Sequence, residues 1–359
     1  MNVDTGKRLG GNAAIALVLL ASLAVYALFP EHFYRAVQED EYLEWGTFWA
    51  FLAAGIIYLR TAAENGFAPR SSWCLLALAA FCLFVAFEEI SWGQRLLGYQ
   101  PPEYFLERNY QQEFNLHNIV PDLFRTLAVV LITVGYGVVA PLALRYLKPL
   151  QPLRSAGVVV PPMYLVPGFA AIGVYYVFRP FRFYEEWVEF ALALAFLFAA
   201  CAANSSARRL FSQNWRSLTV LTAVLVVGWG SALAAQLLMA GEPGKVQTAR
   251  VELAALRKDF VGGNADSRCG RHKRLYAFMR EYDQPGLLEG HFAALTAKGL
   301  PESRAVYFLD PWNYAYWIWD ICESQTGERT TFLYSFGPNQ RRDAMSSDDV
   351  GDDIIVYIR

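Results

Sequence analysis

The sequence predicts an α-helical polytopic membrane protein, with about seven transmembrane helices, that carries a small C-terminal α/β soluble domain. Two observations support this fold class. Of 359 residues, 55% are hydrophobic and 15% aromatic, and the mean hydropathy of +0.22 is high for a soluble chain. The apolar residues also gather in uncharged runs that are long enough to cross about 30 Å of hydrocarbon.

Seven such runs occur before the chain becomes more polar. They are residues 9–30, 45–59, 71–87, 126–144, 155–178, 190–207 and 217–241. The first follows Lys7 and Arg8 without a small-x-small cleavage site, which favours an uncleaved span over a signal peptide. The fifth contains Pro161, Pro162 and Pro167, so a kinked or re-entrant segment is the alternative to a full span.

Charge predicts the orientation of these spans. With a cytoplasmic N-terminus, the inner segments hold ten basic residues and the outer segments six, in agreement with the positive-inside rule. Fourteen acidic residues lie in the outer segments and two in the inner ones. Acidic residues have little influence on topology, so their excess predicts a site on the outer face. We expect the C-terminal domain on the extracytoplasmic side.

A turn-forming Gly-Glu-Pro-Gly sequence at 241–244 divides the chain. Residues 1–241 are predicted to form the transmembrane domain, and residues 242–359 the soluble extracytoplasmic α/β domain. Periodicity predicts helices at 246–260, 271–282, 286–298 and 312–324, and strands at 304–310, 330–336 and 353–359. Cys269 and Cys322 are a candidate disulfide in an extracytoplasmic domain.

Two adjacent carboxylates, Glu88 and Glu89, end the third run in the stretch 86-AFEEISWGQRLLG-98. In a continuous helix, Glu88 shares a face with Ser91, Trp92 and Arg95, whereas Glu89 points about 100° away. Acidic residues within membrane spans are costly and usually functional. The alternative is that both carboxylates cap the helix and pair with Arg95.

A second polar stretch, 109-NYQQEFNLHN-118, alternates polar and apolar side chains. Period two predicts an extended strip with its polar groups on one side; the alternative is an interfacial helix opened by Pro101 and Pro102 through residues 103–110. We predict catalytic roles for Glu88, Glu89, Glu113 and His117. Substrate-binding roles are predicted for Ser91, Trp92, Gln94, Arg95, Asn109, Gln111, Asn115, Arg179 and Arg182.

The composition of this set limits its chemistry. Carboxylates with one imidazole suit general acid–base catalysis or a hard divalent cation such as Mg²⁺ or Mn²⁺, with Glu39 and Asp40 as candidate metal ligands. Arg179 and Arg182, in 178-FRPFRFYEEW-187, suit a phosphate clamp, and an interfacial aromatic belt is the alternative. The chain has no His-x-x-x-His pair, G-x-S-x-G elbow or P-loop, and its net charge of −2 argues against nucleic-acid binding.

A weak internal echo relates two of the predicted span entries. The segments 41-EYLEWG-46 and 186-EWVEFA-191 share the pattern Glu-x-x-Glu-aromatic-small, and both precede spans that enter from the outer side. A parallel duplication is one explanation. The other is that Glu and Trp are simply common at a membrane surface.

The strings 39-EDEYLEW-45, 88-EEISWGQRLLG-98 and 113-EFNLHN-118 resemble a set of uncharacterised bacterial polytopic membrane proteins. This resemblance implies a multi-span fold and a bacterial source, and therefore a bacterial inner membrane with the C-terminal domain in the periplasm, but no activity. In architecture the chain is also similar to C-type polytopic glycosyltransferases, which use polyprenyl-phosphate sugars, place an acidic pair in a longer first outer loop and often end in an extracytoplasmic domain. Glu39 and Asp40 stand at the matching place.

The sequence therefore predicts a membrane enzyme that acts at the extracytoplasmic face on a lipid-linked substrate, by glycosyl or related group transfer. Membrane lipids and that substrate are its expected partners. Two alternatives remain open, namely an ion- or proton-coupled transporter or flippase, and a non-catalytic envelope-assembly protein.

Overall fold

The computed structural model describes residues 10–205, 215–239, 243–261, 272–281, 296–297, 301–322, 329–343 and 351–358. The chain forms two compact units. The first, here called the membrane unit, comprises Met1–Trp92 and Val120–Leu233; the second unit comprises Gly93–Ile119 and Ala234–Arg359. The segment 93–119, which the sequence placed within the transmembrane domain, thus packs with the C-terminal residues.

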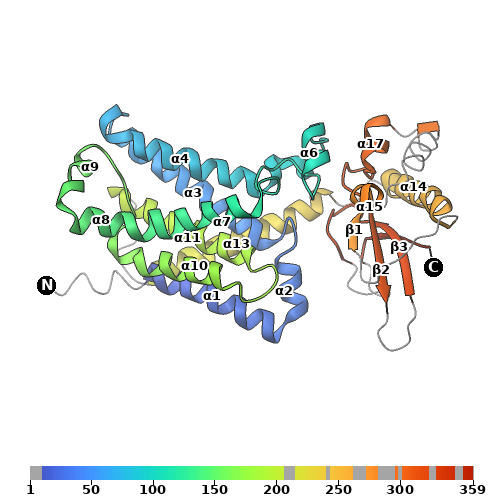
Figure 1. Ribbon diagram of the computed structural model, residues 1–359, viewed down its shortest axis with the longest axis horizontal. Helices are drawn as coiled ribbons and strands as arrows, with labels where there is room; N and C mark the ends of the chain where they lie inside the picture. Colours follow the sequence, from blue (N-terminus) through green and yellow to red (C-terminus); the bar gives the residue numbers. More distant parts are fainter. Residues whose placement is uncertain are drawn as a thin grey trace. The chain divides into compact units, whose positions relative to one another are not determined.

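The membrane unit is a bundle of apolar helices (Figure 1). Its helical elements are α1 (Gly10–Leu28), α2 (Pro30–Ala36), α3 (Tyr42–Glu64), α4 (Pro69–Glu89), η2 (Ser91–Gly93), α7 (Asp122–Val130), η3 (Leu131–Val139), α8 (Ala140–Tyr146), η4 (Lys148–Leu150), α9 (Pro152–Ser155), η5 (Met163–Leu165), α10 (Val166–Phe178), α11 (Glu185–Ala203) and α13 (Trp215–Met239). Gly93 and the end of α13 already belong to the second unit.

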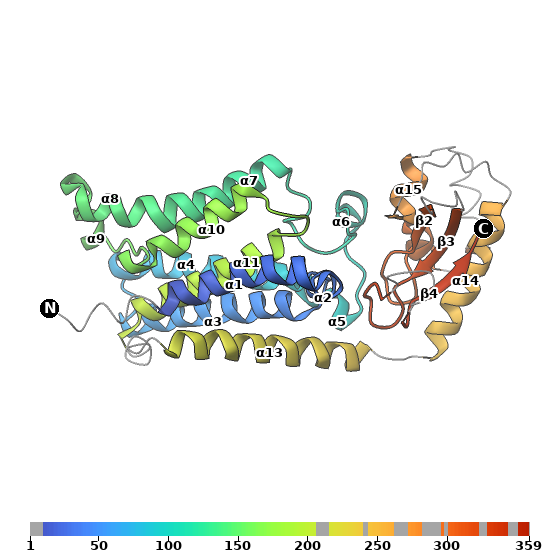
Figure 2. The ribbon, with the colours of Figure 1, turned by 90° about the horizontal axis from the view of Figure 1, so that it is seen from below.

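Six helices of the described chain are long and apolar enough to cross a membrane, which confirms the polytopic helical fold. They are Gly10–Leu28, Tyr42–Glu64, Pro69–Glu89, Asp122–Tyr146, Glu185–Ala203 and Arg216–Leu238. The Pro-rich fifth segment is shorter: residues 158–162 are not helical, and the apolar helix there covers only Met163–Phe178. Its helix α10 nevertheless runs through the bundle beside α1 and α11 (Figure 2).

The two echo segments lie close together in the bundle. Helices α3 and α11 begin with them and pack against each other. A Cβ on Gly46 would lie 2.9 Å from the ring of Phe190, so the glycine permits this close approach. Helix α4 packs on α3 as its antiparallel neighbour. The N-terminal ends of α3 and α11 therefore meet the C-terminal end of α4, and we call this the acidic end of the bundle.

The fourth span contains a π-helical segment, η3, between α7 and α8. Gly137 lies in this segment, and a Cβ there would lie 2.3 Å from the Phe169 ring of α10. Only glycine therefore allows α10 to pack this closely against the fourth span. This contact keeps the short α10 in the bundle.

The predicted continuous helix through Glu88 and Arg95 is wrong. Helix α4 ends at Glu89, and Ser91, Trp92 and Gly93 then adopt left-handed backbone conformations with φ of 45°, 55° and 76°. A helix cannot continue through three such residues. The short α5 (Gln94–Leu97) starts afresh after this turn, so the expected common face of Glu88, Ser91, Trp92 and Arg95 does not form.

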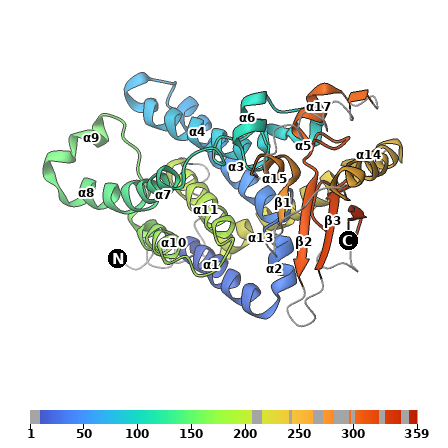
Figure 3. The ribbon, with the colours of Figure 1, turned by 45° about the vertical axis from the view of Figure 1, so that its right-hand side comes forward.

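The second unit contains a four-stranded antiparallel sheet with the order β1-β2-β3-β4 (Figure 3). The strands are β1 (His272–Arg274), β2 (Trp317–Cys322), β3 (Arg329–Ser335) and β4 (Ile354–Tyr357), and the helices are α5, α6 (Glu103–Arg108), α14 (Pro243–Val261), α15 (Leu275–Glu281) and α17 (Glu302–Tyr307). The predicted small α/β domain is therefore present.

Two of the predicted elements in this unit are wrong and a third is wrong in part. Of the helix predicted at 271–282, residues His272–Arg274 form strand β1, and the helix α15 covers only Leu275–Glu281. The expected strand at 304–310 is helix α17 followed by an isolated bridge, and the expected helix at 312–324 is strand β2 with its preceding loop. In β2, Ile318 belongs to one core and Trp317 to the other, so the strand is buried on both faces and its sequence shows no polar alternation. The predicted helix at 286–298 and the candidate disulfide partner Cys269 lie outside the described residues.

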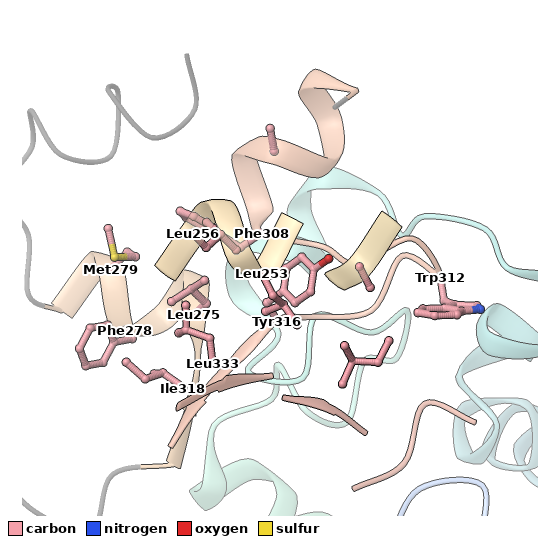
Figure 4. Close-up of a cluster of buried hydrophobic side chains, with 13 residues drawn as sticks. Leu253, Leu256, Leu275, Phe278, Met279, Phe308, Trp312, Tyr316, Ile318 and Leu333 are labelled. Carbon is pink, nitrogen blue, oxygen red and sulfur yellow. The ribbon is translucent and has the colours of Figure 1, made fainter. Parts of the chain in front are cut away.

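The main core of the second unit lies between the sheet and helices α14 and α15. Leu253 and Leu256 of α14 pack with Leu275, Phe308 and Tyr316 over the sheet residues (Figure 4). Together these buried side chains supply most of the apolar burial that holds the unit together.

A buried ion pair lies at the edge of this core. Glu252 accepts hydrogen bonds from Nη2 of Arg304 at 2.6 and 2.7 Å and from the Tyr316 hydroxyl at 2.6 Å. The pair fixes α14 against α17 and the start of β2.

The segment 93–119 is bound to the C-terminal residues by both apolar and polar contacts. Leu106 packs with Tyr307 and Leu309, and Glu103 accepts a hydrogen bond from the Tyr307 hydroxyl at 2.9 Å. Gln112 donates to the carbonyl of Tyr307 at 3.3 Å. This segment is therefore part of the folded second unit rather than a free loop between spans.

Candidate functional site

The acidic end of the membrane unit gathers carboxylates from three helices. Glu89, at the C-terminal end of α4, has Glu189 and Glu186 of α11, Glu44 of α3 and its neighbour Glu88 as its interacting charges. Glu88 and Glu89 are 5% and 9% exposed. The sequence predicted Glu88 and Glu89, and the structure adds Glu44, Glu186 and Glu189 around them; we call these five residues the acidic cluster.

The candidate metal ligands lie at the border of this cluster. Glu39 interacts with Glu186, and Asp40 is buried at 3% exposure in a left-handed conformation. Asp40 donates its backbone N–H to the Glu44 carboxylate, which fixes the turn that enters α3. The loop before α3 thus contributes to the same end of the bundle.

The end of the helix at which each acid lies determines whether that acid can cap the helix. Glu44 and Glu186 lie in the first turns of α3 and α11, where the positive end of the helix dipole favours a carboxylate. Glu88 and Glu89 lie at the C-terminal end of α4, where the dipole disfavours one and the free backbone groups are carbonyl acceptors. The dipole of α4 therefore disfavours the part of the alternative in which both carboxylates cap this helix end.

The two neighbouring carboxylates have different surroundings, as the sequence indicated. Glu88 accepts a hydrogen bond from the indole N–H of Trp92 at 2.7 Å, and Trp92 stacks on Phe87 with ring centroids 5.5 Å apart. Ser91 beside them is buried. Glu89 instead faces α3 and α11. The arrangement gives one carboxylate an oriented hydrogen bond and places the other among like charges.

The acidic cluster alone offers an incomplete set of ligands for a metal cation. Among the residues that the structure describes, Asp343, Asp352 and Asp353 are the only three carboxylates with ligand atoms all within 4.8 Å of one another. They belong to the second unit, and exposed acidic groups are common without an ion. The acidic cluster therefore does not form a ready-made three-carboxylate cage, and neither do Glu39 and Asp40.

The predicted phosphate clamp lies between α10 and α11. Arg179 is the exposed C-terminal cap of α10, with φ of 49°. Arg182 is also exposed and lies over the ring of Phe183 at 4.8 Å. Both arginines are thus accessible, and Arg182 has the aromatic contact expected of a membrane-surface belt.

The remaining predicted residues form a network inside the second unit. Arg95 forms an ion pair with Glu113 at 3.5 Å, and both side chains are almost fully buried. Asn115 donates to Glu113 at 3.1 Å, Asn109 donates to Asn115 at 2.8 Å, and Asn118 donates to Gln111.

Two further predicted residues lie beside this network. Gln94 accepts from the backbone N–H of Phe114 at 2.7 Å. His117 is half-buried in the turn that follows.

This network has turns in place of the extended strip predicted for 109–118. Glu113 and Asn115 are buried, whereas Tyr110 and Leu116 are 57% and 44% exposed. The polar residues satisfy one another inside the segment, so period two reflects an inward-facing polar core. Of the alternative helix at 103–110, the structure has Glu103–Arg108 as α6. The structure therefore divides the predicted site residues between its two units.

The sequence interpretation missed two places with potential for ligand binding. One is a cavity of about 490 Å³ near the C-terminal end of α3, lined in part by Thr61, Arg154 and Pro161. The other is a pocket in the second unit around Arg274, which follows the basic run Arg271-His272-Lys273. Gln112, the residue that interrupts the alternation of 109–118, also lines that pocket.

Comparison with known proteins identifies no relative: no family model, no curated protein and no solved structure matches the chain.

Proposed function

We propose that the protein is an integral membrane enzyme that acts at the extracytoplasmic face of a bacterial inner membrane on a lipid-linked substrate, by glycosyl or related group transfer. The supporting observation is the acidic cluster, in which α3, α4 and α11 bring carboxylates together at one end of an apolar bundle. Acidic side chains in spans are costly and usually functional. At the end of a bundle they are within reach of both lipid head groups and water.

The two carboxylates of α4 suit different tasks in such a transfer. Glu89, among the carboxylates of α3 and α11, is the proposed general base, because taking a proton from an acceptor hydroxyl reduces the repulsion within the cluster. Glu88, oriented by Trp92, would contact the transferred group. A divalent cation would need the substrate's phosphate oxygens to complete its ligands, with Glu39 or Asp40 as protein donors.

The distribution of basic residues supports the extracytoplasmic placement. Four basic residues lie on segments at the end of the bundle opposite the acidic end (Figure 2). They are Arg60 near the end of α3, Arg145 near the end of α8, and Lys148 and Arg154 in the short helices that follow. Basic residues mark the cytoplasmic side of a membrane protein. The acidic cluster is then on the outer side, where polyprenyl-phosphate sugars are used.

Comparative lipid analysis tests this proposal. Cells producing the wild-type chain, Glu88→Gln or Glu89→Gln would be extracted, and polyprenyl-phosphate-linked sugars and phospholipids quantified by mass spectrometry. We expect both variants to lose about 100-fold or more of the transfer rate, since a positioned acid or base contributes 10²–10⁴-fold, so the substrate lipid accumulates. Glu64→Gln is the matched control, because Glu64 lies at the other end of α3 and is paired with Arg60 at 3.1 Å.

Equal protein levels with identical lipid profiles in all four strains would rule out the lipid-transferase function. A second function, a proton-coupled transporter, is favoured by the acidic cluster itself, since grouped acids with a nearby cation, here Arg125 beside Glu186, are suited to proton uptake. Proton flux in reconstituted vesicles that Glu89→Gln abolishes, without any change in lipids, would select this second function.

A further inference from the structure

A pocket of about 210 Å³ lies wholly within the second unit. One wall comes from α6 and the turn after it, including Leu106, Arg108 and Tyr110. The other comes from β1 and α15, including Arg274 and Arg280. The walls are joined by a hydrogen bond of 3.4 Å from Arg280 to the carbonyl of Glu107, so segments far apart in the sequence build one pocket.

Arg274 is the buried cation of this pocket. It is 1% exposed, and its Nε, Nη1 and Nη2 atoms have no hydrogen-bond partner among the residues that the structure describes. The rings of Trp317, Tyr110 and Tyr314 surround its Cζ at 5.1, 5.6 and 5.7 Å. Cation–π contacts stabilise the faces of a guanidinium, but they leave its N–H groups, which are directed outward from its edge, without acceptors. A buried donor set of this kind calls for an anionic ligand.

The other lining residues indicate the charge of that ligand and a second polar group that it should carry. Arg108 and Arg280 are exposed at the rim together with Glu107, so the lining holds three arginines and one carboxylate. Gln112 donates its amide to the carbonyls of Leu106 and Tyr307 at 3.3 Å each. Its Oε1 atom is buried and has no hydrogen-bond partner in the described part of the chain, which leaves an acceptor for a hydroxyl group.

We propose that this pocket binds the phosphate monoester of a small polyol. The phosphate carries about −1.5 to −2 charges at neutral pH, which matches the net charge of the lining better than a single carboxylate does. Arg274 offers its planar fork to two phosphate oxygens, and Gln112 Oε1 accepts a hydroxyl of the polyol. Tyr110 is 57% exposed, so its ring can turn outward as the ligand enters. This site does not depend on the function proposed above.

Two sources present this chemistry, a soluble polyol phosphate and a lipid head group. The probes are glycerol 3-phosphate added to the full-length protein in detergent, and lysophosphatidic acid, which keeps a free glycerol hydroxyl, in nanodiscs with phosphatidylcholine as the neutral lipid. We expect at least one of them to raise the melting temperature of the wild type, because a ligand that binds the folded state stabilises it. A response to glycerol 3-phosphate identifies a soluble ligand, and a response to lysophosphatidic acid alone identifies a head group.

Arg274→Met is the main variant. It removes the buried charge at similar volume, so the ligand-free protein should melt no lower than the wild type, and the response to the active probe should vanish. Arg342→Met is the matched control, because Arg342 lies over Trp319 at 4.1 Å in the same unit but does not line the pocket. This control should keep the full response.

A double variant, Arg108→Gln with Arg280→Gln, provides a test that does not alter a buried residue. It should weaken binding by about 10- to 100-fold for each charged hydrogen bond lost. The melting temperature of the ligand-free protein should fall only slightly, because the hydrogen bond from Arg280 to Glu107 is exposed and long. The proposal is overturned if neither probe stabilises the wild type, or if Arg274→Met and the double variant both keep the wild-type response.

Discussion

Buried carboxylates occur in both units, but with opposite partners. In the second unit, Glu252 is paired with Arg304 and Glu113 with Arg95. In the acidic cluster of the membrane unit, the charges that act on Glu89 are those of other carboxylates. A paired buried acid holds two elements together, whereas a group of like charges opposes folding. The comparison separates acids that serve the fold from acids that serve another purpose.

The same contrast applies to buried arginines. Arg304 is held by two contacts to Glu252 of less than 3 Å, whereas Arg274 has aromatic rings around it and no hydrogen-bond acceptor. A buried charge without its complement is disfavoured in the free protein. Within the described residues, Glu89 among carboxylates and Arg274 among aromatic rings therefore differ from the paired charges of the second unit.

The largest stability effect is expected where the pairing is complete. Glu252→Leu should lower the free energy of unfolding of the second unit by about 3 kcal/mol, because it leaves the partly buried Arg304 without this partner. Hydrogen–deuterium exchange of peptides from α14 and β3 measures this locally. The double variant Glu252→Leu with Arg304→Leu should recover most of the loss. An unchanged exchange rate in the single variant would show that the ion pair does not stabilise the unit.

Asp310 predicts a pH dependence in the same unit. Its carboxylate is fully buried and accepts hydrogen bonds from the backbone N–H groups of Trp312 and Tyr314, both at 2.9 Å, and from the Ser335 hydroxyl at 2.6 Å. Burial is the dominant effect and raises the pKa of Asp310 from 3.8 to about 7, although these hydrogen bonds and the charge of Arg304 lower it.

Between pH of about 4 and 7, folded Asp310 thus holds a proton that the unfolded chain has lost. The folded state must bind more protons in this window, so stability falls as pH rises through it and levels off above about 7. We expect the fall to be about 2–4 kcal/mol, visible as faster exchange of β3. Asp310→Asn should lack this component; if both proteins show the same profile, Asp310 is not its source.

Hydropathy was sufficient to predict the bundle because each span is a long apolar run. Six of the seven predicted runs coincide with the long apolar helices, and Pro161 and Pro162 explain why the fifth run forms a shorter one. Strand β2 could not be recognised, because the aromatic residues around Trp317 are buried on both faces of the sheet. A pattern of polar and apolar residues indicates structure only when one face meets water.

The acidic cluster was predicted in part, and the pocket not at all. Glu88 and Glu89 were recognised because an acid in an apolar run is conspicuous, and Glu44 and Glu186 belong to the echo segments that were noticed beside them. Arg274 and Tyr110 are far apart in the sequence, and an arginine in a basic run gives no sign of burial. Pairings of that kind depend on tertiary structure, which single-sequence patterns do not contain.

The smallest stability effect is expected at the acidic cluster, and it sharpens the comparison between the units. Glu89→Gln removes a charge that the neighbouring carboxylates repel, so the melting temperature in detergent should stay the same or rise, corresponding to about 1 kcal/mol or less. The same substitution at Glu113 takes away the charge that balances buried Arg95, so it should lower stability. If Glu89→Gln destabilises the protein as much as Glu113→Gln does, the acidic cluster holds the bundle together and is structural.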